Sequence, residues 1–179
     1  MLDTPHGFSA KVNDLIFKYI WKYKNPKLKK TTITKSKNEG GLNMIDFILF
    51  DKALKITWVK RLCSDDNWPW KLIPLSLLSK LGGKLLFLCN YNIKYLPINE
   101  HLPKFYQDII SYWQEINSTT PKVKEEIMNQ IIWNNRFIRI NKNSIFFPNW
   151  NKAGIEKLSC LVNEARNSFI SFNAFLQKI

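Results

Sequence analysis

The sequence predicts a mainly α (α+β) fold: a helical domain that carries a short basic extended arm and one β-hairpin. Apolar residues recur at helical spacing along most of the chain, and only the stretch 136–147 alternates in the manner of paired strands. The chain has 179 residues, of which 45% are hydrophobic, so it can form a core and intrinsic disorder is not expected.

The N-terminal part begins with a predicted amphipathic helix over residues 10–23. Asn25-Pro26 ends this helix, because the residue before a proline avoids the α region. Residues 27–35 are lysine-rich and β-branched, which favours a strand or an extended arm, and a glycine turn follows at 38–41. The apolar stripe of the helix consists of Val12, Leu15, Ile16, Tyr19, Ile20 and Tyr23.

The most regular helical pattern covers residues 44–63. Asp51 and Lys55 stand four residues apart on its polar face and can form an ion pair. Either Asn43 or Asp46 is placed to cap its first turn. Its apolar stripe consists of Phe47, Phe50, Leu54, Trp58 and Leu62.

The remaining elements follow from weaker patterns. We expect a helix over 70–81 that Gly82-Gly83 ends, followed by short helix and loop over 84–98. Helices are then expected over 103–116 and 121–130, and a β-hairpin over 136–147 with its turn at 141–143. The last two expected helices cover 151–163 and 171–178, and Ser171 caps the second of them. We expect two regions, a basic one over 8–63 and a helical one over 64–179, or a single domain made of both.

The charge balance favours a polyanionic partner. Lysine and arginine number 27 against 14 acidic residues, which gives a net charge of +13. Such an excess indicates nucleic acid or an anionic membrane surface. The excess is concentrated, since residues 18–37 contain eight lysines and no acidic residue.

Catalytic and metal-binding patterns are not found in the sequence. His6 and His101 have no cysteine at metal-ligand spacing, and the three cysteines form no C-x-x-C pair, so we expect no zinc and no other cofactor. The acidic pair Asp65-Asp66 has no third carboxylate at a usable spacing and is interpreted as a solvated turn. The odd cysteine number favours a reducing compartment, and we expect the cytoplasm or the nucleus.

The candidate binding site is the lysine-rich segment 18–37. Lysines without arginine suit loose contact with backbone phosphates better than bidentate contact with bases. Tyr19, Ile20 and Tyr23 are interpreted as core residues, while Trp21 lies off the stripe and can either pack beneath the lysines or stack on a base. The candidate contacts are Lys22, Lys24, Lys27, Lys29, Lys30, Lys35, Lys37 and Trp21.

A second basic group consists of Arg136, Arg139 and Lys142 in the predicted hairpin. Successive residues of a strand point to opposite faces, so Arg136 and Arg139 fall on different sides. We therefore interpret these charges as scattered surface residues.

Several segments in order resemble the region that follows the reverse transcriptase domain in LINE-type (non-LTR) retrotransposon polyproteins. The resemblance covers about residues 11–175. It is carried by the stretch 15–21 with the lysines around Pro26, Gly40-Gly41-Leu42, Asp46-Phe47, Lys52-Ala53-Leu54, Gly82-Gly83 to Phe87, Cys89-Asn90-Tyr91-Asn92, Trp133-Asn134-Asn135, Trp150 and Gly154-Ile155.

The resemblance implies a non-catalytic fragment, because the aspartates of the family's Phe/Tyr-Ala-Asp-Asp motif, its endonuclease domain and its zinc knuckle have no counterpart in this sequence. It implies that the lysine-rich segment holds template RNA or target DNA non-specifically, alongside the rest of a retroelement polyprotein. Three alternatives stay open: a module that binds a protein or an anionic membrane, a fragment with a hidden enzymatic activity, and a chain that is not stably folded by itself.

Overall fold

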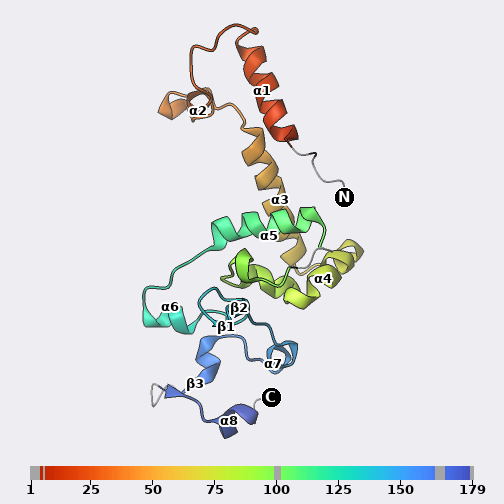
Figure 1. Ribbon diagram of the computed structural model, residues 1–179, viewed down its shortest axis with the longest axis vertical. Helices are drawn as coiled ribbons and strands as arrows, with labels where there is room; N and C mark the ends of the chain where they lie inside the picture. Colours follow the sequence, from red (N-terminus) through yellow and green to blue (C-terminus); the bar gives the residue numbers. More distant parts are fainter. Residues whose placement is uncertain (1–4, 6, 99–101, 164–167, 178–179) are drawn as a thin grey trace. The chain divides into compact units, whose positions relative to one another are not determined.

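The computed structural model describes residues 5, 7–98, 102–163 and 168–177, so His6 and His101 lie outside the described residues. The chain divides into two compact units, Met1–Trp58 and Val59–Ile179, each of which is described by itself. The predicted mainly helical class is confirmed (Figure 1), and the described residues form two small antiparallel strand pairs where one hairpin is predicted.

The first unit contains α1 (Phe8–Ile20), α2 (Lys30–Ile33), η1 (Lys37–Glu39) and the first part of α3 (Phe47–Cys63). The predicted helix over 10–23 is confirmed only as far as Ile20. Lys22 and Tyr23 have φ angles of 47° and 60°, in the left-handed region. Their N–H groups donate back to the carbonyls of Tyr19 and Lys18, which closes the helix three residues early.

The extended arm predicted over 27–35 is wrong in its second half, because Lys30–Ile33 forms one turn of helix. The turn exists because it buries Ile33 completely. The carbonyl of Ile33 then accepts hydrogen bonds from the N–H groups of Leu42 and Met44, at 3.1 and 3.2 Å. The chain after η1 is thereby fastened to the end of α2.

Helix α3 begins where its capping residue predicts. Asp46 Oδ1 accepts the N–H groups of Ile48 and Leu49 at 2.8 and 3.4 Å. Asn13 of α1 also contacts the start of α3. Its Nδ2 donates to Asp46 Oδ1 at 2.9 Å, and its Oδ1 accepts the N–H of Phe47 at 2.8 Å. The predicted ion pair between Asp51 and Lys55 is also present, at 3.4 Å.

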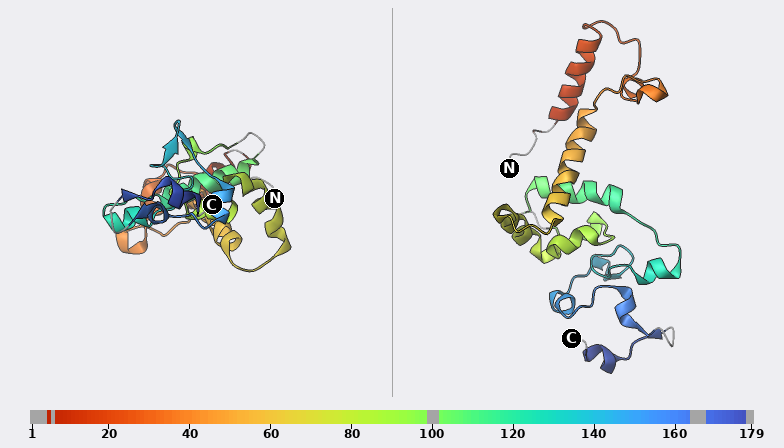
Figure 2. Two further views of the ribbon diagram at one scale, coloured as in Figure 1. Left: turned by 90° about the horizontal axis from the view of Figure 1, so that it is seen from below. Right: turned by 180° about the vertical axis from the view of Figure 1, so that it is seen from behind.

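The second unit is built around α5 (Lys104–Asn117). This helix lies beside η4 (Gly83–Leu88) and η5 (Ile93–Tyr95), as two views show (Figures 1 and 2). Trp113 Nε1 donates to the carbonyl of Phe87 and the Tyr91 hydroxyl donates to the carbonyl of Ile110, both at 2.7 Å. The largest fully buried side chains of the second unit include Trp133, Tyr91, Phe87, Leu62, Leu78, Leu86, Ile109, Ile110 and Ile155.

The other elements of this unit are short. They are η2 (Pro69–Lys71), α4 (Leu72–Leu78), η3 (Ser79–Leu81), α6 (Lys124–Met128), β1 (Arg139–Ile140), β2 (Asn143–Ser144), α7 (Pro148–Lys152), η6 (Leu158–Leu161), β3 (Val162–Asn163), β4 (Ser168–Phe169) and α8 (Phe172–Leu176). The helix predicted over 151–163 is wrong, because Gly154 at φ 80° ends α7 and the chain then pairs as β3 with β4. Ser171 caps α8 as predicted.

Candidate nucleic-acid interface

The seven lysines of the candidate site are all exposed to solvent. The seven lysines differ in whether another side chain of the protein binds their ammonium group. Lys30 forms an ion pair with Asp14 of α1 and lies 5.4 Å from the centroid of the Phe17 ring. Within the part of the chain that the structure describes, the other six ammonium groups have no hydrogen-bonded or ion-paired partner: Lys22, Lys24, Lys27, Lys29, Lys35 and Lys37. These six can meet an external anion without breaking an internal contact.

Four of the six lysines lie at the end of α1 or in the irregular connection after it, and the other two lie on a fixed turn. Lys22 lies in the left-handed closure of α1, and Lys24, Lys27 and Lys29 lie in the irregular connection between α1 and α2. A connection without repetitive hydrogen bonds can adjust the spacing of its charges to that of a phosphate chain. This part of the site fits contact with many different sequences.

Lys35 and Lys37 instead lie on a fixed turn. The carbonyl of Lys35 accepts the N–H of Asn43, and the carbonyl of Ser36 accepts the N–H of Gly41, both at 2.9 Å. A Cβ at Gly41 would lie 2.0 Å from the carbonyl oxygen of Lys35, so this close approach requires glycine. The glycine turn that the sequence predicts therefore holds two of the candidate contacts in place.

The aromatic residues of the segment differ from their predicted roles. Tyr19 and Tyr23, expected in the core, are 77% and 76% exposed, and Ile20 is also exposed. Trp21 is half-buried, packs edge-on against Phe17 with ring centroids 6.4 Å apart, and has a buried indole Nε1. Helical spacing identifies a stripe without showing what covers it, so the two tyrosines, and not Trp21, present rings beside the lysines.

Asp14 places an acidic group in contact with this basic segment. The hydrogen bond from Lys30 and the positive charges of Lys30 and Lys18 lower the pKa of its carboxyl. The carboxylate therefore stays charged at neutral pH and neutralises Lys30. The sequence shows no acidic residue between positions 18 and 37, but the fold places Asp14 of α1 next to Lys30 of this segment.

The second basic group serves the fold of the second unit. Arg136 Nη2 donates to the carbonyl of Tyr91 at 3.1 Å and to the Ser118 hydroxyl at 2.7 Å. The guanidinium of Arg139 lies 4.2 Å from the centroid of the Tyr95 ring. The two arginines thus contact different parts of the unit.

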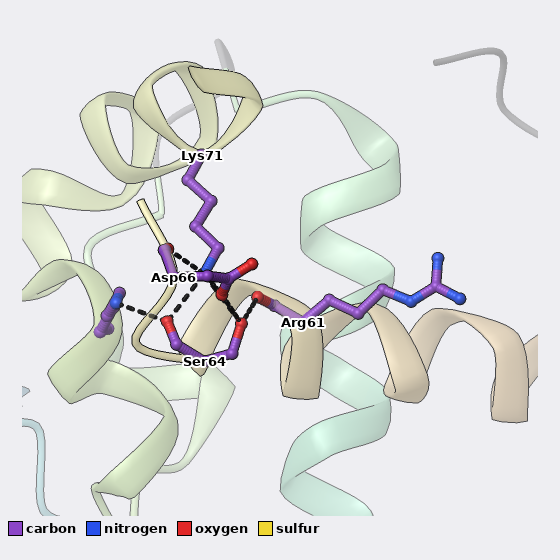
Figure 3. Close-up of polar contacts among 5 residues, drawn as sticks. Arg61, Ser64, Asp66 and Lys71 are labelled. Carbon is purple, nitrogen blue, oxygen red and sulfur yellow. Dashed lines mark hydrogen bonds and ion pairs between the residues drawn. The ribbon is translucent and has the colours of Figure 1, made fainter. Parts of the chain in front are cut away.

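Asp66, one residue of the Asp65-Asp66 pair, lies beside a buried ammonium group (Figure 3). Lys71 is 3% exposed, and its Nζ donates to the carbonyls of Ser64 and Asp66, each at 2.7 Å, and to Asp66 Oδ1 at 2.5 Å. Hydrogen bonds from Lys71 and Ser64 lower the pKa of Asp66. No group of three metal-ligating side chains occurs among the described residues. Asp66 therefore secures the loop after α3.

No protein-family model, curated protein or solved structure matches this chain. The resemblance to LINE-type polyproteins thus stays a prediction that depends on the residues quoted for it. Among the described residues no helix has the length and apolar character needed to cross a membrane.

Proposed function

We propose that this chain is a non-catalytic nucleic-acid-binding module of a LINE-like reverse transcriptase, which holds template RNA or target DNA through backbone phosphates. The observation that carries the proposal is the set of six exposed lysines that have no partner in the described part of the chain, with Tyr19 and Tyr23 exposed beside them. Ammonium groups supply sequence-independent affinity through release of counterions. Exposed aromatic rings add stacking on unpaired bases.

The main alternative is a module that binds an anionic membrane or another protein through α1. Leu15 and Tyr19 of α1 are exposed, and none of its residues is buried. An interfacial helix, however, places its lysines along the flanks of its apolar face. Here Lys24, Lys27 and Lys29 come after the helix has ended, which favours a polyanion that the connection can follow.

The test is fluorescence anisotropy with the full chain and labelled single-stranded RNA, single-stranded DNA and duplex DNA at a fixed salt concentration near 0.1 M. The variant changes Lys27, Lys29 and Lys35 to alanine. Its matched control changes Lys60, Lys80 and Lys152, which are exposed lysines outside the segment, so the two proteins have the same net charge.

We expect the segment variant to bind each nucleic acid at least tenfold more weakly, because each lost phosphate contact removes part of the counterion release. We expect the control variant to keep most of the affinity. Equal losses in the two variants would show that only the net charge matters and would contradict a localised site. Binding of anionic vesicles in preference to every nucleic acid would favour the alternative.

A further inference from the structure

A cavity of about 820 Å³ with both polar and apolar lining residues lies within the second unit, away from the lysine-rich segment in the sequence. Four parts of the chain line it: the stretch 88–90, the stretch 119–122 that links α5 to α6 (Figure 1), the end of α6 with the residues that follow it, and Lys157. A second, apolar cavity of about 300 Å³ shares Thr120, Pro121 and Gln130 with it. Both volumes fall in the range of small-ligand sites.

The 820 Å³ cavity contains several polar groups that are free to bind a ligand. Its lining includes the ammonium groups of Lys122 and Lys157, and one acidic side chain, Glu126, which accepts the backbone N–H of Lys122 at 2.7 Å. Across the described ranges, no partner is found for the side chains of Thr119, Thr120, Lys122, Asn129 and Lys157. Two cations and several neutral hydrogen-bonding groups suit a ligand that carries both an anion and a polar middle part.

The apolar cavity offers a flat surface. It is lined by Ile127, Phe137, Ile138 and Leu158 besides the three shared residues. The Phe137 ring is 55% exposed and has no aromatic partner within the described part of the chain. An exposed phenylalanine at the wall of a cavity can stack on a planar ring.

A buried amide fixes the boundary between the two cavities. Asn135 is fully buried and donates from Nδ2 to Gln130 Oε1 at 2.8 Å and to the carbonyl of Ile131 at 2.9 Å. Its Oδ1 accepts the N–H of Phe137 at 2.9 Å. Because the oxygen of Gln130 is engaged, its NH₂ group is the end that remains for a ligand. One residue thus positions a hydrogen-bond donor and an aromatic ring together.

The outer walls are fixed as well. Asn90 Nδ2 donates to the carbonyl of Thr119 at 2.7 Å, which holds the 119–122 stretch. Opposite it, an antiparallel bridge joins Ile131 to Lys157, with hydrogen bonds from Ile132 N–H to Glu156 and from Leu158 N–H to Gln130. The cavity is therefore held between two backbone segments and does not depend on loose side chains.

We propose that the two cavities bind one unpaired nucleotide of a single-stranded nucleic acid, with its phosphate at Lys122 and Lys157 and its base against Phe137. A nucleotide combines an anion, a polar sugar and a flat base, which match the ammonium groups, the neutral polar groups and the exposed ring that line the two cavities. A base within a duplex is stacked and paired, so its face is not available to the Phe137 ring. The proposal shares no residue with the lysine-rich segment and does not depend on it.

The test uses the full chain and a short single-stranded oligonucleotide that contains 2-aminopurine, whose fluorescence falls when the base stacks on an aromatic ring. We expect the wild-type chain to quench the probe. The variant Phe137→Leu keeps the apolar volume but removes the aromatic face, and we expect it to abolish the quenching and weaken binding about tenfold. A Lys122→Gln, Lys157→Gln double variant should weaken binding without unfolding the chain, because both side chains are exposed.

The control changes Lys22, Lys24 and Lys27 to glutamine and leaves both cavities intact. We expect it to lower the affinity while the saturated complex keeps its quenching, so a failure of the lysine-rich segment and a failure of the cavity are distinguishable. Unchanged quenching in a folded Phe137→Leu variant would overturn the proposal. So would displacement of the probe by an acidic peptide at concentrations where mononucleotides have no effect, since that result would identify a peptide site.

Discussion

Asp46 illustrates how one side chain can set both a helix start and a pH response. Its carboxylate caps α3 and accepts a hydrogen bond from Asn13. These hydrogen bonds, that from Asn13 first, lower the pKa of Asp46 in the folded chain. A carboxyl whose folded pKa lies below its unfolded value, about 3.9, stabilises the fold above that pH, and this contribution disappears as the pH falls through the folded pKa.

We predict that Asp46→Ala lowers the free energy of unfolding by about 0.5–2 kcal/mol, because the first turn of α3 loses its cap. Asp46→Asn should cost less, since asparagine caps a helix almost as well. Urea unfolding at pH 7 and again between pH 4 and pH 2 checks both statements. The wild type should lose stability on acidification more steeply than Asp46→Asn, and identical pH profiles would contradict the assigned role.

Asp14 reduces the number of lysines that can bind an external phosphate. The Asp14 carboxylate pairs with Lys30, which leaves that lysine unavailable to an external phosphate. The variant Asp14→Asn removes the charge and releases Lys30, so we predict affinity for single-stranded RNA about two- to fivefold higher than the wild type. Anisotropy titrations near 0.1 M salt measure this change. A loss of affinity would mean that the ion pair organises the site.

At the scale of elements, the end of α1 contains a residue in an unfavourable conformation. Lys22 adopts φ 47°, a region in which glycine meets no steric penalty and other residues do. We predict that Lys22→Gly raises the free energy of unfolding by about 0.5–1 kcal/mol and weakens nucleic-acid binding by one phosphate contact. Thermal unfolding, with Lys22→Ala as the control that loses the charge alone, separates the two effects. Equal stability of the glycine and alanine variants would contradict the closure described for α1.

Elements with a local signal could be predicted from the sequence. The Asp46 cap, the Asp51–Lys55 pair, the Gly82 stop and the Ser171 cap depend on neighbouring residues, and each is present. Elements that depend on distant contacts could not be predicted. The helical turn at Lys30–Ile33 exists because Ile33 is buried and its carbonyl accepts hydrogen bonds from Leu42 and Met44, which follow η1.

The candidate site was predictable to the same extent. Lysine content is visible in the sequence, and all seven lysines are exposed as a basic site requires. The ion pair that occupies Lys30 joins residues 16 positions apart and could not be read from the segment 18–37 alone. The cavity beside Phe137 combines side chains from 120 to 158, which no single motif joins.

At the scale of the whole molecule, the apolar stripe of α3 is buried only towards the C-terminal end of that helix. In the stripe of α3, Phe50 and Leu54 are exposed, whereas Trp58 and Leu62 are buried. Helical spacing predicted all of these positions equally, because periodicity shows which residues share a face but not what covers that face.

Contact between phosphates and six lysines of the segment 18–37 has a direct signature in the salt dependence of binding. We would measure binding between about 50 and 300 mM salt, for the wild type and for a variant with Lys27, Lys29 and Lys35 changed to alanine. Six contacts predict a slope of log K against log salt of about −4 on single strands and about −5 on duplex DNA, and the variant should flatten it by about 2 to 3. A wild-type slope near zero, or an unchanged slope in the variant, would contradict the account.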